Sequence, residues 1–298
     1  MQTAQLRKRL TPYLFLLPGM AFLMVWLVYP MGHAFFISLR DWNPVPGQPS
    51  PFVGLNNYGQ AFGDATFRLA LKNTALYVAI TVLGQLILGV GVALLLDRLL
   101  RGRVFFRTLY YLPVVTSWVV VSLLFKYLFN SSPAGMINYL LVDVTHLLAQ
   151  PVAWLNEPGT AFIALYSLGI WKGVGWTMVI ILAALQSLPE DCFQAAAIDG
   201  ASGLQSLFYI TLPLLLPTIV LVLIMLTIGG FQTYIPIALV TGGGPLHRTE
   251  VLLTYMYDQA FSDLNYGYAS AQAYILAAIV FVISQVQLRL HRPVDILA

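Results

Sequence analysis

Long apolar segments alternate with short polar segments along this chain. The apolar segments cover residues 13–39, 69–96, 108–129, 160–186, 213–240 and 268–290. A helix that crosses the hydrocarbon core of a bilayer needs about 20 mostly apolar residues, and each segment reaches that length. The pattern therefore predicts an all-α, polytopic membrane protein with six transmembrane helices, which form a single transmembrane domain over residues 1–298.

The polar segment at residues 187–212 differs from the other interhelical loops because it carries signals of internal order. Ser187 and Glu190 have the spacing of a capping box, and Pro189 lies where a first helical turn tolerates the missing N–H group. Gly200 can adopt backbone angles that an alanine cannot. We predict a short helix that starts at Ser187, a break at Gly200, and a second helix that leads into the next span.

The predicted helix in this loop has an apolar face made mostly of small side chains. These residues recur at helical spacing, whereas Asp191, Gln194 and Asp199 fall elsewhere on the helix. Such a surface suits insertion into a cleft on a partner protein better than it suits chemistry. The face consists of Phe193, Ala196, Ala197, Ala201 and Leu204.

Composition agrees with a membrane protein and excludes other classes. The chain is 59% hydrophobic and 9% charged, with a mean hydropathy of +0.79, whereas soluble domains are about a quarter charged. The net charge of +3 is too small to indicate nucleic-acid binding. Cys192 is the single cysteine and the four histidines are scattered, so we expect neither a disulfide within the chain nor a metal site.

The distribution of basic residues predicts the orientation of the spans. With both termini in the cytoplasm, nine lysines and arginines lie on the cytoplasmic side and five on the outer side, as the positive-inside rule requires. The cytoplasmic set is Arg7, Lys8, Arg9, Arg98, Arg101, Arg103, Arg107, Arg289 and Arg292, and the outer set is Arg40, Arg68, Lys72, Lys126 and Arg248.

Several sequence motifs resemble one known family. FQAAAIDGA and the following ITLPLLLP resemble the EAA loop of bacterial ABC-importer permeases, a cytoplasmic coupling helix that docks on the ATPase subunit. FVGLNNY, YYLP and TGGGPLHRTE resemble segments of the sugar-transporting branch of that family. Gln194 stands where the family usually has a glutamate, which removes a charged contact with the ATPase and leaves docking by shape.

The resemblance implies a permease subunit of an ATP-driven carbohydrate importer, similar to the maltose-type permeases, in the bacterial plasma membrane. It implies that the chain catalyses no reaction and holds no cofactor, because a dimer of a partner ATPase binds ATP and Mg²⁺. The other implied partners are a second, homologous permease, an extracytoplasmic solute-binding protein and membrane lipid. The residues assigned to ATPase coupling are Pro189, Gln194, Ala195, Ala196, Asp199, Gly200 and Ala201.

Alternative functions make predictions that this sequence does not meet. A secondary carrier needs ionisable groups within its spans, and no aspartate or glutamate lies in the middle of a predicted span. A membrane-embedded transferase predicts carboxylates or histidines clustered at one membrane face, and none is evident. The chain has no GxxxxGK[ST] loop, so any pump must take energy from a partner. A related solute, such as a glycerol phosphate, stays open as an alternative to a sugar.

Polar residues within the predicted spans are candidates for the solute path. Lys172 is the one charge deep in a span, and such a charge requires a partner or water. It lines the path, or it snorkels or neutralises a structural partner, and the structural role is favoured. Gln232 and Tyr234 could hydrogen-bond a polyhydroxylated solute, although such groups more often bond neighbouring helices.

Overall fold

The computed structural model describes residues 2–98, 101–133 and 135–290, and the side chains of residues 13–98, 101–133 and 135–289. Arg292, which counts toward the predicted cytoplasmic side, lies outside these ranges. The described residues form helices and connecting loops without a β-strand, and their one sheet-like contact is an isolated bridge between Arg40 and Phe52. The predicted all-α fold is confirmed.

Five continuous helical segments of the described residues are long and apolar enough to cross a membrane. The first runs through α1 (Gln2–Leu23), a π-helical turn (Met24–Val28) and α2 (Tyr29–Ser38), and its apolar part is Tyr13–Ser38. The others are α4 (Ala65–Arg98), α8 (Pro158–Leu185), α14 (Tyr266–Leu290) and a segment made of α10 (Gly203–Ser206), a π-helical turn (Leu207–Thr211) and α11 (Leu212–Phe231).

The sixth candidate span is broken into two helices. Its parts are α5 (Arg103–Val115) and α6 (Trp118–Leu128), which differ in direction by 95°. Thr116 and Ser117 between them have extended backbones, and the Ser117 hydroxyl accepts a hydrogen bond from the Val119 N–H group. This side-chain cap starts a new helix, so segment 108–129 is not the single helix that its apolar run suggests.

Segment 213–240 is also interrupted. α11 ends at Phe231, and α12 (Ile235–Val240) begins after a short break. Pro236 lies in the first turn of α12, where its missing N–H group leaves no intrahelical bond unmade, and Tyr234 has φ −133° and ψ −61° at the start of that helix. At its other end the span begins earlier than expected, because the helix runs continuously from Gly203.

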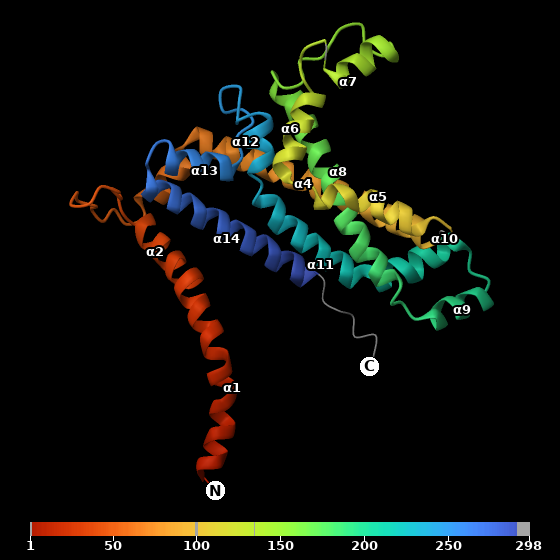
Figure 1. Ribbon diagram of the computed structural model, residues 1–298, viewed down its shortest axis with the longest axis horizontal. Helices are drawn as coiled ribbons and strands as arrows, with labels where there is room; N and C mark the ends of the chain where they lie inside the picture. Colours follow the sequence, from red (N-terminus) through yellow and green to blue (C-terminus); the bar gives the residue numbers. More distant parts are fainter. Residues whose placement is uncertain (1, 99–100, 134, 291–298) are drawn as a thin grey trace. The chain divides into compact units, whose positions relative to one another are not determined.

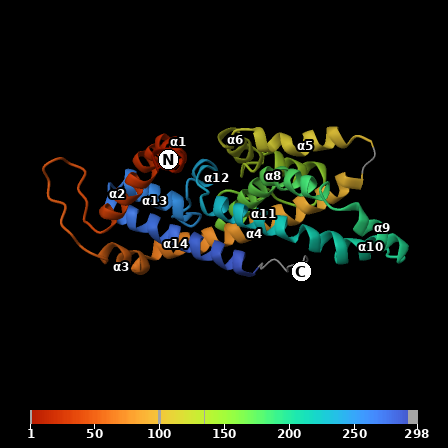
Figure 2. The same cartoon turned by 90° about the horizontal axis from the view of Figure 1, so that it is seen from below.

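The chain divides into two compact units. The larger contains Ala65–Tyr255 and the residues from Leu276 onward, and in it α4 packs along α8 and α11, α5 packs on α8, and α6 packs on α12 (Figures 1 and 2). Glycines permit the close α4–α8 contact: a Cβ added at Gly84 would overlap Ile170, and one added at Gly89 would overlap Thr177.

Two buried clusters form the core of the larger unit. The α6–α12 cluster consists of Tyr77, Val121, Phe125, Phe129, Ala164, Leu165, Leu168, Ile237, Val240 and Val251. The α11 cluster consists of Ala93, Leu96, Met178, Ile181, Leu182, Leu215 and Val222. Each broken span has a helix on either side of its break, and α6 and α12 contribute only to the first of these clusters.

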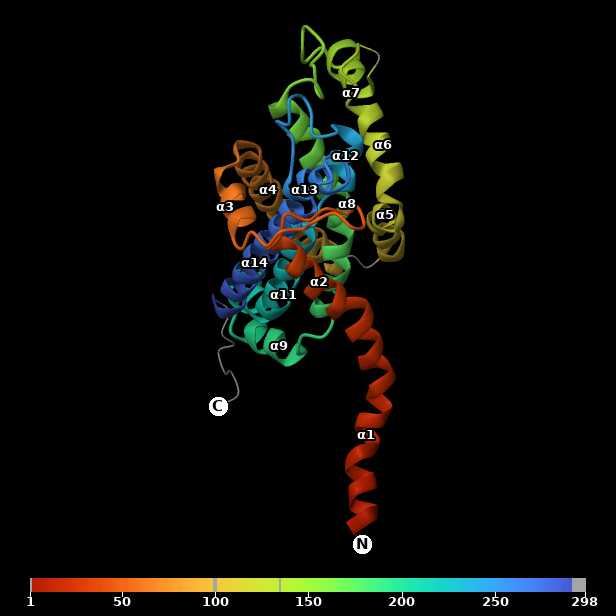
Figure 3. The same ribbon diagram turned by 90° about the vertical axis from the view of Figure 1, so that its left-hand side faces the viewer.

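Two further elements of the larger unit mark its ends. A short helix, α7 (Met136–Tyr139), and a π-helical turn (Leu140–Val144) lie in the segment that joins α6 to α8. α9 (Glu190–Ile198) follows α8, and Figure 3 shows α7 and α9 at opposite ends of this unit. The loops before and after α8 therefore lie on opposite sides of the helices that they join.

The smaller unit contains the residues up to Asp64 and Met256–Ile275. It includes α3 (Asn56–Gly63), the end of α13 (Leu252–Phe261) and the start of α14. Asn57 Nδ2 donates to the carbonyl oxygens of Ser38 and Arg40, each at 2.9 Å, and the Tyr268 hydroxyl donates to Asp64 at 2.7 Å. Polar side chains of α3 and α14 thus stabilise a unit whose apolar helix, Tyr13–Ser38, is almost wholly exposed.

Candidate functional site

α9 begins at Glu190, and its start differs from the prediction. Pro189 is the N-cap, in an extended conformation and without a side-chain cap. The Ser187 hydroxyl instead donates to the carbonyl oxygen of Ala184 at 2.8 Å. The predicted capping box between Ser187 and Glu190 is therefore wrong. A proline disfavours helical backbone angles in the residue before it, so a helix that starts at Ser187 would strain Leu188.

Gly200 ends α9 as predicted. Its φ of +76° lies in the left-handed region, the Gly200 N–H group donates to Ala197 O at 3.2 Å, and the Ala201 N–H group donates to Ala196 O at 2.9 Å. These two bonds form a Schellman motif, which glycine permits because it has no Cβ. The chain then reverses away from the α9 axis.

A capping box lies just beyond this turn, at Ser202 rather than Ser187. The Gln205 N–H group donates to the Ser202 hydroxyl at 3.3 Å, and the Ser202 N–H group donates to Gln205 Oε1 at 2.7 Å. This box begins α10, which continues into the long span. The loop is therefore helix, glycine turn and capped helix, with both helix ends satisfied locally.

α9 exposes most of its surface, and no residue of the helix is buried. Ile198 is 86% exposed, and Leu204 just beyond the turn is 69% exposed. Phe193 and Ala196 are half-buried, so part of the predicted apolar face turns toward the chain itself. Of the predicted coupling residues, Pro189, Gln194, Ala195, Asp199 and Gly200 are exposed, whereas Ala196 and Ala201 are half-buried.

Lys172 lies in the middle of α8 and bonds to the break in the third span. Its Nζ donates to Pro113 O at 2.8 Å, to Thr116 O at 2.7 Å and to Val114 O at 3.4 Å. The ammonium also lies 4.8 Å from the centre of the Trp118 ring, within cation–π range. All three donors are directed at backbone oxygens, which favours a structural partner over a solute contact.

Gln232 and Tyr234 lie at the break between α11 and α12. Gln232 is exposed and forms the C-terminal cap of α11, while Tyr234 is half-buried at the start of α12. The sequence places them within one apolar run, but the structure puts them where the helix is interrupted. The Lys172 ammonium bonds instead to the other broken span.

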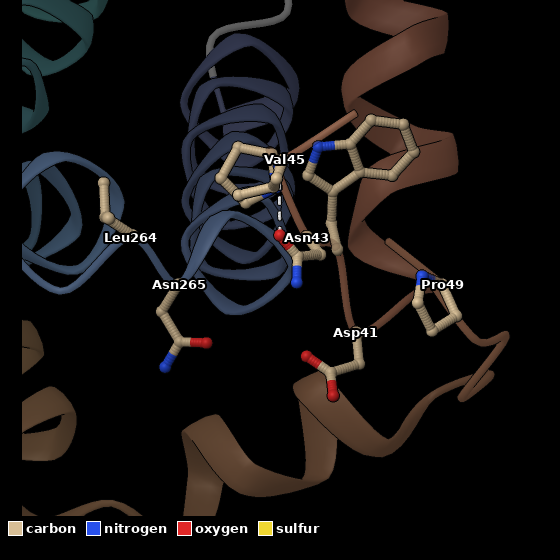
Figure 4. A pocket seen from close by; sticks show the side chains of 8 residues that line it. Asp41, Asn43, Val45, Pro49, Leu264 and Asn265 are labelled. Atoms are coloured by element: carbon tan, nitrogen blue, oxygen red, sulfur yellow. Dashed lines mark hydrogen bonds between the residues drawn. The ribbon is translucent and has the colours of Figure 1, made fainter. Parts of the chain in front are cut away.

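A pocket of about 330 Å³ lies in the smaller unit, between the loop after α2 and the start of α14. The Asp41 carboxylate and the Asn265 amide approach its open space from different segments, and Asn43 Oδ1 accepts a hydrogen bond from Val45 N–H at 3.0 Å (Figure 4). None of the predicted coupling or path residues lines it. Its lining residues are Asp41, Trp42, Asn43, Pro44, Val45, Pro49, Leu264 and Asn265.

A buried polar network holds the glycine-rich loop after α12, and the sequence analysis missed its two central residues. Asn73 of α4 donates through Nδ2 to Arg248 O at 2.9 Å and to Glu250 O at 2.8 Å. The Glu250 side chain is 2% exposed and bonds to Thr254 and His247. A Cβ at Gly243 would overlap the Glu250 carboxylate. This glycine therefore allows a charged group to be enclosed by the loop.

We expect Asn73→Ala to loosen this loop. The substitution removes two bonds and leaves two buried carbonyls without their donor, which costs about 1–3 kcal/mol. Thermal unfolding of the purified protein in detergent should show a lower Tm than the wild type. Asn156→Ala is the matched control, because Asn156 is exposed in a loop. Equal Tm values for the two variants would contradict this role of Asn73.

Among the residues whose placement the structure describes, no group of three or more His, Cys, Asp and Glu side chains could hold a metal ion. The candidate functional site is the loop at residues 187–212. Its central part is α9, a short exposed helix between two spans.

Known proteins with similar sequences and folds are membrane transport components. A family model described as "Binding-protein-dependent transport system inner membrane component" matches residues 85–294. The multiple sugar-binding transport system permease protein MsmF of Streptococcus mutans is 32% identical, over 98% of this chain and 99% of that protein. The sn-glycerol-3-phosphate transport system permease protein UgpA of Rhizobium meliloti is 33% identical, over 97% of each chain.

The fold is similar to a solved transporter as well. A crystal structure of a bacterial ABC transporter involved in the import of the acidic polysaccharide alginate contains a chain that matches with a TM-score of 0.83. The sequence identity is 25%, and the match covers 99% of this chain and all of that one.

Proposed function

Because the chain belongs to the family of inner membrane components of binding-protein-dependent transport systems, we propose that it forms the solute path of an ATP-driven importer and couples that path to an ATPase through α9. One observation carries the coupling role. α9 is exposed between two spans and ends in a glycine turn that two hydrogen bonds close, so a partner that binds α9 can act on both spans at once.

We propose a carbohydrate as the solute. The related MsmF belongs to a sugar-binding transport system, and the alginate transporter of similar fold acts on a polysaccharide. The related UgpA belongs to a glycerol-phosphate system, so a phosphorylated polyol is the alternative. Gln232 and Tyr234 are the proposed solute contacts, since amide and phenol groups at a helix break can exchange hydrogen bonds with hydroxyl groups.

The proposed assembly contains this chain, a second homologous permease, a dimer of ATPase subunits that binds ATP and Mg²⁺, and an extracytoplasmic binding protein. Both termini and α9 lie in the cytoplasm in this proposal. ATP closes the ATPase dimer, the docked helices move together, and the spans open to the outside to accept solute. No residue of this chain takes part in ATP hydrolysis in this scheme, and its contribution is mechanical.

A pull-down from mild detergent tests the assembly. The tagged chain should recover an ATPase and a second membrane subunit, identified by mass spectrometry. Because detergent can strip subunits, the same question is asked in intact membranes by crosslinking at Cys192, which is exposed on α9. If neither the pull-down nor the crosslinking recovers an ATPase, the proposal is contradicted. Recovery of the binding protein would allow its solute to be screened.

We expect Gln194→Glu to support normal transport. Gln194 is exposed on α9, and the new carboxylate has nearly the same shape as the amide. The family residue at this position is usually glutamate, so the ATPase surface should accept it. Solute uptake and copurification of the ATPase are the measurements. Loss of the ATPase from the variant complex would instead show a partner surface adapted to a neutral side chain.

A further inference from the structure

We propose that Lys172 is a positioning residue for coupled transport: it ties α8 to the break in the third span, so that movement of α9 reaches the helix beyond that break. This inference rests on the proposed function, because it names the connection through which the coupling movement passes. The contacts that carry it join α8, the end of α5 and the start of α6.

The Lys172 ammonium donates hydrogen bonds to carbonyl oxygens at the C-terminal end of α5. Lys172 is 4% exposed, and burial of an unpaired charge costs several kcal/mol. The carbonyls of Pro113 and Val114 belong to the last turn of α5, where no further helical N–H group can reach them. The ammonium donates to both oxygens at the negative end of the helix dipole, and the Thr116 hydroxyl also donates to Pro113 O at 2.6 Å.

The same ammonium also contacts the far side of the break. Thr116 O accepts its shortest hydrogen bond, and Trp118 is the first residue of α6. One side chain on α8 thus contacts both helices that meet at the 95° bend. A change in its position would alter the direction of α6 relative to α5.

Residues 186–189 connect α8, which carries Lys172, to α9. α8 is continuous from Pro158 to Leu185, and α9 begins at Glu190. α5 is packed tightly on the same helix, since a Cβ at Gly175 would overlap the backbone of Tyr110. In this proposal, a displacement of α9 is passed through residues 186–189 to α8 and, by this close packing, to α5. Lys172 is the polar contact at the point where α6 departs.

Lys172 also lies between the two core clusters. Leu168, one turn before it, belongs to the α6–α12 cluster, whereas Met178, less than two turns after it, belongs to the α11 cluster. α6 and α12 contribute to the α6–α12 cluster alone and α11 to the α11 cluster alone, whereas α4 and α8 contribute to both. Lys172 thus lies on α8 between the segment that packs in one cluster and the segment that packs in the other.

Transport by the complete complex in proteoliposomes tests the proposal. The wild type, Lys172→Met and Lys172→Arg are each reconstituted with the partner permease, the ATPase and the binding protein. Methionine has a side chain of similar length to lysine but no charge. We therefore expect the amount of solute transported per ATP hydrolysed to fall about tenfold in Lys172→Met, a typical coupling effect. Arg keeps donors for the carbonyls and should restore most of this ratio. Lys126→Met, at an exposed position near the end of α6, should leave it unchanged.

A normal ratio for Lys172→Met would overturn the proposal, and so would an equal loss in the Arg and Met variants. If Lys172→Met does not assemble, hydrogen–deuterium exchange on the wild-type complex tests whether the coupling movement reaches the start of α6. The amides of residues 116–122 should change their exchange rate when a non-hydrolysable ATP analogue binds, and unchanged rates would overturn the proposal. A wild-type complex without ATP-driven uptake would instead refute the proposed function itself.

Discussion

Gly200→Val should reduce transport about 5- to 30-fold while the spans remain inserted, because about 1–2 kcal/mol is lost at the left-handed turn that closes α9. Gly200 has φ +76°, a conformation in which the Cβ of an L-residue meets the following carbonyl, and β-branching makes this worse. The turn would open, and the Ala201 to Ala196 hydrogen bond would break. Uptake and copurification of the ATPase are the measurements.

Gly200→Asn is the matched control for this prediction. Asparagine tolerates left-handed backbone angles better than other residues with a Cβ, so the turn should persist. Nothing lies within 4 Å of a Cβ built at this position, so neither variant clashes with another side chain of the chain. If valine transported as well as asparagine, the backbone angle would not matter, and the assignment of α9 as the coupling helix would fail.

Gly175→Ala should strongly destabilise the larger unit. The added Cβ would overlap the Tyr110 carbonyl oxygen and lie 3.1 Å from the Tyr111 Cα, so backbone rather than a flexible side chain must move. Overpacking of this kind costs about 1–3 kcal/mol or more. The yield of detergent-solubilised protein and its Tm are the measurements, and both should fall sharply.

Two other glycines provide controls for that effect. A Cβ at Gly173 would overlap the Gln85 side chain, which can rotate away, so Gly173→Ala should be milder. Gly91→Ala on α4 should be neutral or slightly stabilising, because nothing lies within 4 Å of the added atom and alanine favours helix. We expect the highest Tm for Gly91→Ala, a lower Tm for Gly173→Ala and the lowest Tm for Gly175→Ala. A Gly175 variant as stable as the Gly91 variant would contradict the close α5–α8 contact.

Apolar periodicity predicts where helices lie but not where they break. Residues 108–129 are apolar on both sides of Thr116 and Ser117, so hydropathy gives one continuous span there. The 95° bend arises from two extended residues and the Ser117 cap, which are local polar effects inside an apolar run. The break at Gln232 to Tyr234 was equally hidden, although Pro236 in the next turn is a signal for a helix start.

The loop at residues 187–212 was predicted better because its signals are local. A glycine after an alanine-rich helix indicates a left-handed turn, and the structure has it at Gly200. The start of the helix was misplaced because the capping pattern at Ser187 ignored the restriction that Pro189 imposes on Leu188. A second capping pattern, Ser202 to Gln205, has the same spacing and is the one that forms.

Long-range partners could not be read from the sequence. The oxygens bonded by Lys172 lie 56 to 59 residues earlier in the chain, and the loop held by Asn73 lies 175 to 177 residues later. A lone lysine in an apolar run indicates that some partner exists but not which one. Glu250 looks like a loop residue in the sequence, and only the fold shows that it is buried.

Lys172 divides α8 into two halves that extend in opposite directions along the helix axis. α8 has 28 residues and is thus about 42 Å long at 1.5 Å per residue, which exceeds the roughly 30 Å hydrocarbon core of a bilayer. Lys172 is close to its midpoint, so the two halves are nearly equal. A tilt about this point moves the two ends by similar distances in opposite directions. In the proposed transport cycle, such a tilt would close the solute path at the α9 end while it opened the path at the Pro158 end.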